Sequence, residues 1–227
     1  MFVNACNQIR ETIYGVMGLS VLATNQVAAS NGTAFMIAPG IIATAAHLCH
    51  LNSDSTQPRH SQFEAIRSPD VGQSLEAATF IAEDTQRDIA LLRLTSPRSN
   101  ACVVLDVNRI PSGTPCGSLG FPLASVSFSQ SGRLFNLVER FQSASVSAFI
   151  SIAQSGQQLS QYETDSLMYP GSSGCPGFLE NAKVFAMHVR SVMDQNAAQT
   201  SQTRISISRW VPASDIRDFA RTNGISV

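Results

Sequence analysis

The sequence predicts an all-β protein, a barrel or a sandwich, in which helices occur only at the two ends of the chain. Many short apolar runs recur along its 227 residues, and residues typical of turns separate them. A segment rich in proline and glycine, residues 108–122, divides these runs into two halves. Since 44% of the residues are apolar, we expect the chain to fold unaided, as one large domain or as two small ones that share a core.

The first residues predict a short helix over 6–14, because Ile9 and Ile13 are spaced four apart. The apolar-leaning stretch 12–29 overlaps this helix. Glycines and polar residues interrupt it, so it is a weak signal peptide and too polar for a membrane span. Asn31-Gly32-Thr33 matches an N-glycosylation acceptor, which would have no role in an intracellular protein.

Strands are predicted for the rest of the first half. Pro39-Gly40 suits a turn, because proline sets the first backbone angle and glycine accepts a positive one. We expect a hairpin there and a polar surface loop over much of 50–72, with His50 and His60 facing solvent. The predicted strands are 33–38, 41–44, 63–67, 75–83 and 88–94.

The second half repeats this pattern. We expect a hairpin over 126–138 that turns at Ser131-Gly132, and strands at 145–152, 183–192 and 204–211. Pro212 suits the first turn of a C-terminal helix over 212–222, and Gly224 suits its end.

Charge and cysteine content exclude several classes of partner. Fifteen basic and sixteen acidic residues form no basic stripe, so neither nucleic acid nor a membrane is an expected partner. Five cysteines, an odd number without a C-x-x-C pair, indicate free thiols and a cytoplasmic protein. No cluster has the spacing of metal ligands, and we expect no metal or cofactor.

The segment 171–176, Gly-Ser-Ser-Gly-Cys-Pro, is the strongest candidate for chemistry. Ser173 is the candidate nucleophile, because flanking glycines let the backbone turn sharply beside it. The N–H groups of Gly171 and Ser173 could then point at one spot and stabilise an oxyanion. A Gly/Ser turn without chemistry is the alternative for this segment taken alone.

Two other residues complete a candidate triad. His47 follows a predicted strand, and small alanines before it leave room to hold the imidazole in place. Asp88 begins another strand, 41 residues after His47 and 85 before Ser173. The order His, Asp, Ser excludes an α/β-hydrolase, in which the serine comes first on a G-x-S-x-G elbow.

These segments resemble the trypsin-like (chymotrypsin-fold) serine proteases, most closely the HtrA/Deg branch. Thr44-Ala45-Ala46-His47 resembles the family's histidine motif, Asp88-Ile89-Ala90-Leu91-Leu92 its aspartate motif, and 162–176 its nucleophile segment. Gly120-Phe121-Pro122 and 127–134 are similar to the start of the second barrel in HtrA-type proteases. The likeness covers roughly residues 16–222 and leaves nothing over for a PDZ domain.

The resemblance implies two antiparallel six-stranded β-barrels, about 16–107 and about 116–211, with a short N-terminal helix and a C-terminal helix at 212–222. It implies a serine endopeptidase that forms an acyl-enzyme, with His47, Asp88 and Ser173 as the triad and Gly171 and Ser173 as the oxyanion hole. The expected partners are protein or peptide substrates inside the cell. The same resemblance leaves the oligomeric state open.

Several residues are alternatives to the members of the candidate triad. Asp84 competes with Asp88, Ser172 with Ser173, and Cys175 is an alternative thiol nucleophile. Ser172 also stands where trypsin-like zymogens have aspartate and HtrA-type proteases asparagine, so activation by a freed N-terminus is not expected. A latent binding or scaffold module, a protease switched on by a protein partner, and an esterase are the other readings.

The substrate pocket, by its register in the resemblance, is lined by 167–170 and 187–191. Its candidate residues are Met168, His188, Val189 and Arg190. His188 has a placement similar to the histidine with which glutamyl endopeptidases bind an acidic side chain, whereas Met168 stands where those enzymes have a hydroxyl. Both an acidic or amide side chain and a medium apolar one remain open as the preferred substrate residue.

Overall fold

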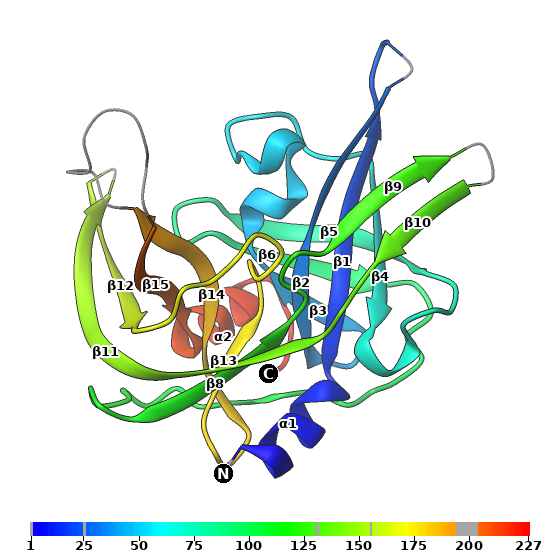
Figure 1. The fold of residues 1–227 in the computed structure, drawn as a ribbon. Coiled ribbons are helices and arrows are strands. Elements are labelled where there is room, and N and C mark those ends of the chain that lie inside the picture. The colour runs from blue at the N-terminus through cyan, green and yellow to red at the C-terminus, as the bar shows by residue number, and fades with distance from the viewer. Residues whose placement is uncertain (1, 25, 130–131, 155, 194–203) are drawn as a thin grey trace.

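The computed structural model describes residues 2–24, 26–129, 132–154, 156–193 and 204–227. Its strands form two units that lie side by side (Figure 1). Helix α1 (Val3–Arg10) precedes the first unit, and helix α2 (Ala213–Thr222) follows the second. The C-terminal helix is therefore confirmed, with Pro212 at its N-cap rather than inside it.

Six strands close the first unit into an antiparallel barrel, in the order β1-β2-β3-β6-β5-β4. Gly40 has a φ of +72° between β2 and β3, so the predicted hairpin is confirmed. Side chains of these two strands and of β6, such as Phe35, Ile42 and Leu92, are fully buried in the core. The strands are β1 (Ile13–Val21), β2 (Val27–Ala38), β3 (Ile41–Thr44), β4 (Gln62–Arg67), β5 (Glu76–Asp84) and β6 (Ile89–Leu94).

The second unit contains a seven-stranded sheet, and a pairing between β13 and β14 closes six of its strands into a ring. The ring order is β13-β8-β11-β12-β15-β14, with antiparallel neighbours throughout. The two six-stranded barrels implied by the resemblance are thus confirmed. The strands are β8 (Pro115–Gly120), β11 (Arg140–Gln154), β12 (Gln157–Thr164), β13 (Pro176–Phe178), β14 (Lys183–Met193) and β15 (Arg204–Pro212).

Three short strands lie outside these rings. β7 (Val104–Leu105) runs parallel to β14 at the edge of the second sheet. β9 (Ser125–Ser129) and β10 (Gly132–Asn136) form the separate hairpin predicted for 126–138. Ser131, the first residue of its predicted turn, lies outside the described residues.

The N-terminal helix exists, but its predicted bounds are wrong. It ends at Arg10, and Ile13 already pairs with Phe35 in the β1–β2 hairpin, so the stretch 12–29 is mostly strand. Residues 13–19 are all buried, without the alternation that reveals a half-exposed strand. One reason is that Leu137 of the second unit packs on Gly15, so β1 is covered by more than its own barrel.

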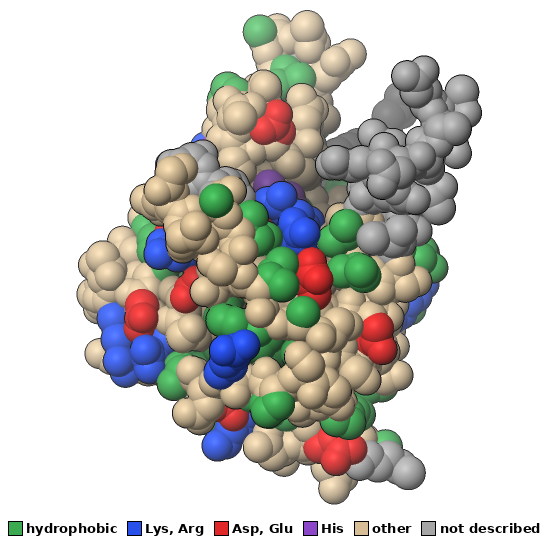
Figure 2. Space-filling view, turned by 90° about the vertical axis from the view of Figure 1, so that its left-hand side faces the viewer, with side chains coloured by type: hydrophobic (Ala, Val, Ile, Leu, Met, Phe, Trp, Pro, Cys, Tyr) green, Lys and Arg blue, Asp and Glu red, His purple; other side chains and the backbone are tan. Residues whose placement is uncertain are grey.

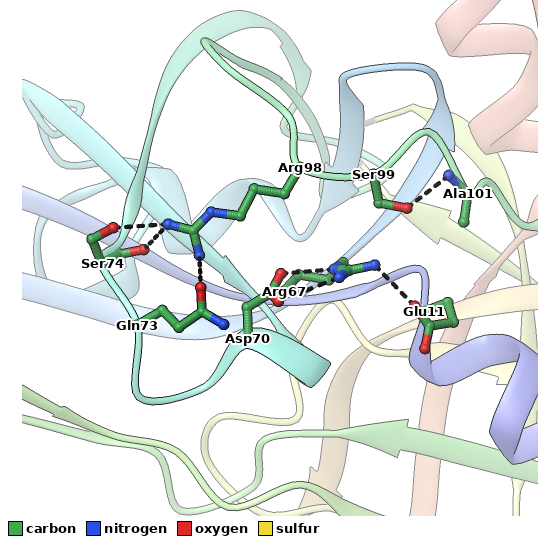
Figure 3. A network of polar contacts seen from close by, with 8 residues as sticks. All are labelled: Glu11, Arg67, Asp70, Gln73, Ser74, Arg98, Ser99 and Ala101. Carbon is green, nitrogen blue, oxygen red and sulfur yellow. Dashed lines mark hydrogen bonds and ion pairs between the residues drawn. The ribbon is translucent and has the colours of Figure 1, made fainter.

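A polar network lies beside α1, at one end of the first barrel (Figure 3). Arg67 donates from Nε to Asp70 Oδ2 at 2.8 Å and from Nη1 to Glu11 Oε2 at 2.9 Å. Arg98 donates to Ser74 Oγ at 2.8 Å. These contacts join the helix-to-strand link, the end of β4 and two loops.

The surface carries no single dominant charge on the face that Figure 2 shows, where basic and acidic side chains are interspersed. Within the described ranges, no helix is both long and apolar enough to cross a membrane. The same part of the chain contains no group of His, Cys, Asp and Glu side chains arranged to hold a metal ion.

Candidate active site

His47 and Asp88 lie together at one end of the first barrel. His47 sits on the 3₁₀ helix η1 (Ala46–Cys49), directly after β3, and Asp88 directly precedes β6. Strands β3 and β6 are paired neighbours, and this pairing brings the two residues together. Asp88 accepts two hydrogen bonds from His47, from its backbone N–H at 2.9 Å and from ring Nδ1 at 2.7 Å.

The environment of Asp88 keeps its carboxylate charged. Burial favours the neutral acid, but the hydrogen bonds and charge of His47 outweigh it, so the pKa of Asp88 is lowered. Its φ of +62° lies in the left-handed region, which aspartate tolerates better than most residues. Because the carboxylate accepts a hydrogen bond from Nδ1–H, Nε2 of His47 is left without a proton and can act as a base.

Ser173 lies in the loop between β12 and β13, and the peptide groups around it are firmly held. The carbonyls of residues 170–173 all accept hydrogen bonds: Pro170 from Leu123 N at 2.6 Å, Gly171 from Thr33 Oγ1 at 2.9 Å, Ser172 from Cys175 N at 2.9 Å, and Ser173 from Thr33 N at 2.9 Å. Gly171 has a φ of +91°, which permits the sharp turn. The loop therefore has one defined backbone conformation.

Of the N–H groups of residues 171–174, two donate hydrogen bonds to other described residues and two do not. Ser172 N donates to Tyr169 O at 3.0 Å and Gly174 N to His188 O at 2.8 Å. The N–H groups of Gly171 and Ser173 make no hydrogen bond to any other described residue. In a trans peptide the N–H points opposite to the carbonyl, so these two donors face away from the groups that hold the loop.

The loop packs directly against the segment that leads to His47. A Cβ on Gly174 would lie 2.5 Å from Thr44 Oγ1 and 3.1 Å from Ala45 N, and would also collide with Thr33 O. Gly174, with a φ of +82°, is thus required for this close approach. The contact places Ser173 and His47 at the same junction of the two barrels.

No hydrogen bond joins the Ser173 hydroxyl to the His47 ring in the described structure. Ser173 is partly exposed, and the His47 side chain is 20% exposed. Both groups can therefore be reached from solvent. In proteins without bound substrate such catalytic hydrogen bonds are often long and tighten only in the complex.

Comparison with known proteins identifies the family of this chain. The family model of the trypsin-like peptidase domain matches residues 32–187, more than half of the chain. This protein belongs to that family. The predicted family membership is thus confirmed, and a peptidase function is supported with it. A comparison with curated proteins gives no match.

Solved structures similar to this trypsin-like peptidase domain include the Rv3671c protease from M. tuberculosis. Its active form is 16% identical, with a TM-score of 0.73, over 98% of this chain and 85% of that chain. Its inactive form is 14% identical, with a TM-score of 0.70, over 97% of this chain and 93% of that chain. At this identity the likeness establishes the fold.

The four candidate pocket residues of this peptidase domain differ in exposure. Met168, His188 and Val189 are buried, whereas Arg190 is exposed. The carbonyl of Met168 accepts a hydrogen bond from Ser191 Oγ at 2.8 Å, which joins the two predicted walls. The charge of Arg190 contributes to lowering the pKa of Asp88, so this wall lies close to the candidate triad.

His188 is a buried, neutral histidine. It is 3% exposed, packs edge-on against Trp210, and neither ring nitrogen meets hydrogen-bond geometry with another described residue. Burial, followed by the charge of His47, lowers the pKa of His188 to about 3, although the backbone of Ser172 and Arg190 favours the protonated ring. The imidazole therefore carries no charge at neutral pH.

The competing residues occupy less suitable places. Ser172 is 1% exposed and its hydroxyl has no hydrogen-bond partner among the described residues. Cys175 is fully buried, and burial raises its pKa, so the thiol stays protonated. Asp84 accepts from Arg87 Nη1 at 2.6 Å, and its other hydrogen bonds in the described structure come from the backbone of its own turn, not from a histidine. All five cysteines are free.

The expectation that His50 and His60 face solvent is wrong. Both are buried, because the loop after η1 folds back onto the barrel. His50 contacts Glu83 Oε2 through Nε2 at 2.7 Å, and His60 contacts Ser30 Oγ through Nε2 at 2.9 Å. Their role is to hold this loop together.

Sequence reasoning missed Thr33, which makes several of the contacts above. It is 0% exposed and lies in β2, where the sequence predicted a strand from residue 33 and a glycosylation acceptor but no role in the site. No periodicity could find it, because its hydrogen bonds to Gly171 and Phe121 cross 138 and 88 residues of sequence.

Proposed function

We propose that this trypsin-like peptidase domain is a serine endopeptidase with His47, Asp88 and Ser173 as its triad. Ser173 would attack the carbonyl carbon of a peptide bond while His47 Nε2 takes the hydroxyl proton. His47 then gives that proton to the leaving amine, and an acyl-enzyme remains. Water, activated by the same histidine, releases the second product and restores Ser173. Asp88 holds the ring and stabilises its charged form.

The observation that carries this proposal is the pattern of free and paired groups in the nucleophile loop. The carbonyls of residues 170–173 are all bonded, while the N–H groups of Gly171 and Ser173 remain free among the described residues. Two free donors two residues apart on one loop suit the oxyanion of a tetrahedral intermediate. They lie on the loop that packs beside the His47–Asp88 pair.

A fluorophosphonate probe tests the proposal, because it reacts with activated serines and leaves ordinary hydroxyls unmodified. We expect labelling of the wild-type protein, with the adduct on the peptide that contains Ser173. Labelling should vanish in Ser173→Ala and persist in Ser172→Ala, the matched change at the adjacent serine. A folded wild-type protein that is not labelled, or a label on another residue, would contradict the assignment.

A latent module is the second candidate, and the missing hydrogen bond between His47 and Ser173 favours it. In this case a protein partner or the substrate would bring the two side chains together. The two candidates differ in the isolated protein, where a latent site is labelled slowly and a competent site quickly. An esterase on the same triad is distinguished by offering protein and ester substrates side by side.

For the substrate, we propose intracellular proteins, in keeping with the five free cysteines. At the residue before the cut, a medium apolar side chain is favoured over an acidic one. His188 is neutral and buried, so it offers no positive charge, and Met168 lies on the opposite wall. Peptide cleavage profiles decide this point, since an acidic preference would require His188 or Arg190 to bind the carboxylate.

A further inference from the structure

Thr33 lies at the point where the two barrels meet. Its backbone N–H donates to Ser173 O at 2.9 Å, and its hydroxyl donates to Gly171 O at 2.9 Å. The same hydroxyl accepts from Phe121 N at 3.0 Å, and its carbonyl accepts from Thr44 Oγ1 at 2.7 Å. The side chain is 0% exposed, and all its polar groups are used.

These contacts hold the peptide planes next to the two free donors of the nucleophile loop. Gly171 O shares its plane with Ser172 N–H, and Ser173 O shares its plane with Gly174 N–H, so the planes that Thr33 holds lie on either side of the Ser173 N–H. Thr33 holds two of the four loop carbonyls directly, those of Gly171 and Ser173. Through Phe121 it also anchors the turn in which Leu123 N holds Pro170 O at 2.6 Å. When a carbonyl is held, the N–H at the other end of its peptide plane is held as well. Pro170 O thus orients Gly171 N–H.

We infer that Thr33 is a positioning residue for the oxyanion hole, acting from the first barrel on a loop of the second. This inference rests on the proposed function, because it gives the Gly171 and Ser173 donors a task. The hydroxyl of Thr33 makes the largest contribution to this positioning, since it both donates to Gly171 O and accepts from Phe121 N. Without that hydroxyl, two buried backbone groups lose their partner and the loop can rotate.

The test compares Thr33→Val, which has nearly the same shape but no hydroxyl, with Thr33→Ser, which keeps the hydroxyl. We expect kcat to fall about 100-fold in Thr33→Val, the effect of losing one oxyanion donor, with KM changed less than about threefold. Thr33→Ser should stay within about threefold of wild type. Each assay is run well below the melting temperature of the variant concerned.

Thr12→Val is the matched control. Thr12 is also buried, and its hydroxyl donates to Ile9 O at 2.7 Å, but it lies between α1 and β1 and not at the junction. We expect this variant to lose stability and to keep the wild-type kcat. If Thr33→Val does not fold, Thr33→Ala, which also removes the hydroxyl that Gly171 O and Phe121 N share, gives the same comparison with Thr33→Ser.

A second measurement isolates the oxyanion hole. A peptide aldehyde forms a tetrahedral adduct whose oxygen needs the two N–H donors, whereas the matching peptide alcohol does not. Thr33→Val should weaken binding of the aldehyde by about the same factor by which kcat/KM falls, and it should leave the affinity for the alcohol unchanged. Equal weakening of both inhibitors would indicate a merely structural role.

The outcomes separate this inference from the proposed function. If wild-type protein neither cleaves peptides nor reacts with the fluorophosphonate, the proposed function fails first. If the wild type is active and Thr33→Val keeps its kcat and its aldehyde affinity, the inference about Thr33 alone is overturned. A loss of kcat in Thr33→Val that Thr33→Ser restores supports both.

Discussion

Asp88 is the residue whose role depends most clearly on its geometry. It accepts both hydrogen bonds from His47, and its left-handed backbone turns the carboxylate toward the ring. In Asp88→Asn the shape is kept, but the ring loses the acceptor that fixes its tautomer. We expect kcat to fall about 10⁴-fold with a small change in KM, measured on a peptide substrate.

Asp84→Asn is the control for this change. Asp84 lies four residues earlier and binds Arg87 and the backbone of its own turn. The variant should retain activity within a few fold. A large loss of activity in Asp84→Asn, with Asp88→Asn still active, would indicate that Asp84 and not Asp88 is the carboxylate of the triad.

Cys175 lies two residues after Ser173, and its burial predicts an inert thiol. Because burial raises its pKa, the reactive thiolate is absent at neutral pH. Cys175→Ala should therefore keep at least about a tenth of wild-type kcat, since the change removes only the buried Sγ and keeps the Cβ that packs beside Gly120. Iodoacetamide should leave the native enzyme active. Inactivation by iodoacetamide, together with an inactive Cys175→Ala, would favour a thiol mechanism.

The residues of the candidate triad could be predicted from the sequence, whereas the residues that hold them in place could not. His47, Asp88 and Ser173 stand in short local motifs, in which the neighbouring residue types follow from the chemistry. Thr33 and the turn at Leu123 act through hydrogen bonds to distant segments. Such partners depend on how the barrels pack, which no local pattern records.

The network beside α1 in Figure 3 makes a prediction about stability at the scale of elements. The hydrogen bonds of Arg67 to Asp70 hold the pKa of Asp70 below its usual value. The folded state thus binds a proton on Asp70 more weakly than the unfolded state. Its contribution to stability is present above the unfolded pKa of about 3.9 and is lost as pH falls through the folded pKa.

Asp70→Asn should therefore lower the free energy of unfolding by about 1 kcal/mol at pH 7, measured by urea denaturation. The difference from wild type should begin to shrink as pH falls below the unfolded pKa of about 3.9, and it should vanish only below the lower folded pKa, where Asp70 is also neutral. Asp218→Asn, an exposed change on α2, serves as the control and should have little effect. A difference that is constant with pH would rule out the ion pair as its cause.

Strand prediction succeeded where one face is exposed or a turn signal is strong. The hairpin at Pro39-Gly40 follows this rule, whereas β14, which is buried from residue 184 to 189, was predicted from its apolar run. β1 was missed because Ile13 was assigned to a helix by its spacing from Ile9 and because glycines interrupt the apolar run that follows. β13 was missed because it has only three residues. Both strands also pair with strands that are distant in the sequence, β1 with β4 and β13 with β8, and no local propensity records such a pairing.

The arrangement of the whole molecule places the two parts of the site on different barrels. His47 and Asp88 belong to the first barrel, and the Ser173 loop belongs to the second, between β12 and β13. The barrels are joined at the site by Thr33 and by the close packing of Gly174 on Thr44. The two-barrel arrangement itself came from the family resemblance, because strand patterns alone allowed a sandwich as well.

The most direct test of the central claim is a peptide-library cleavage profile of wild type and Ser173→Ala, read by mass spectrometry. We predict that the wild type cuts internal peptide bonds with one side-chain preference before the cut. Ser173→Ala, folded to the same extent by circular dichroism, should lose at least about 10⁴-fold in rate. Cleavage by Ser173→Ala at the same bonds and a similar rate would contradict the assignment of Ser173 as nucleophile.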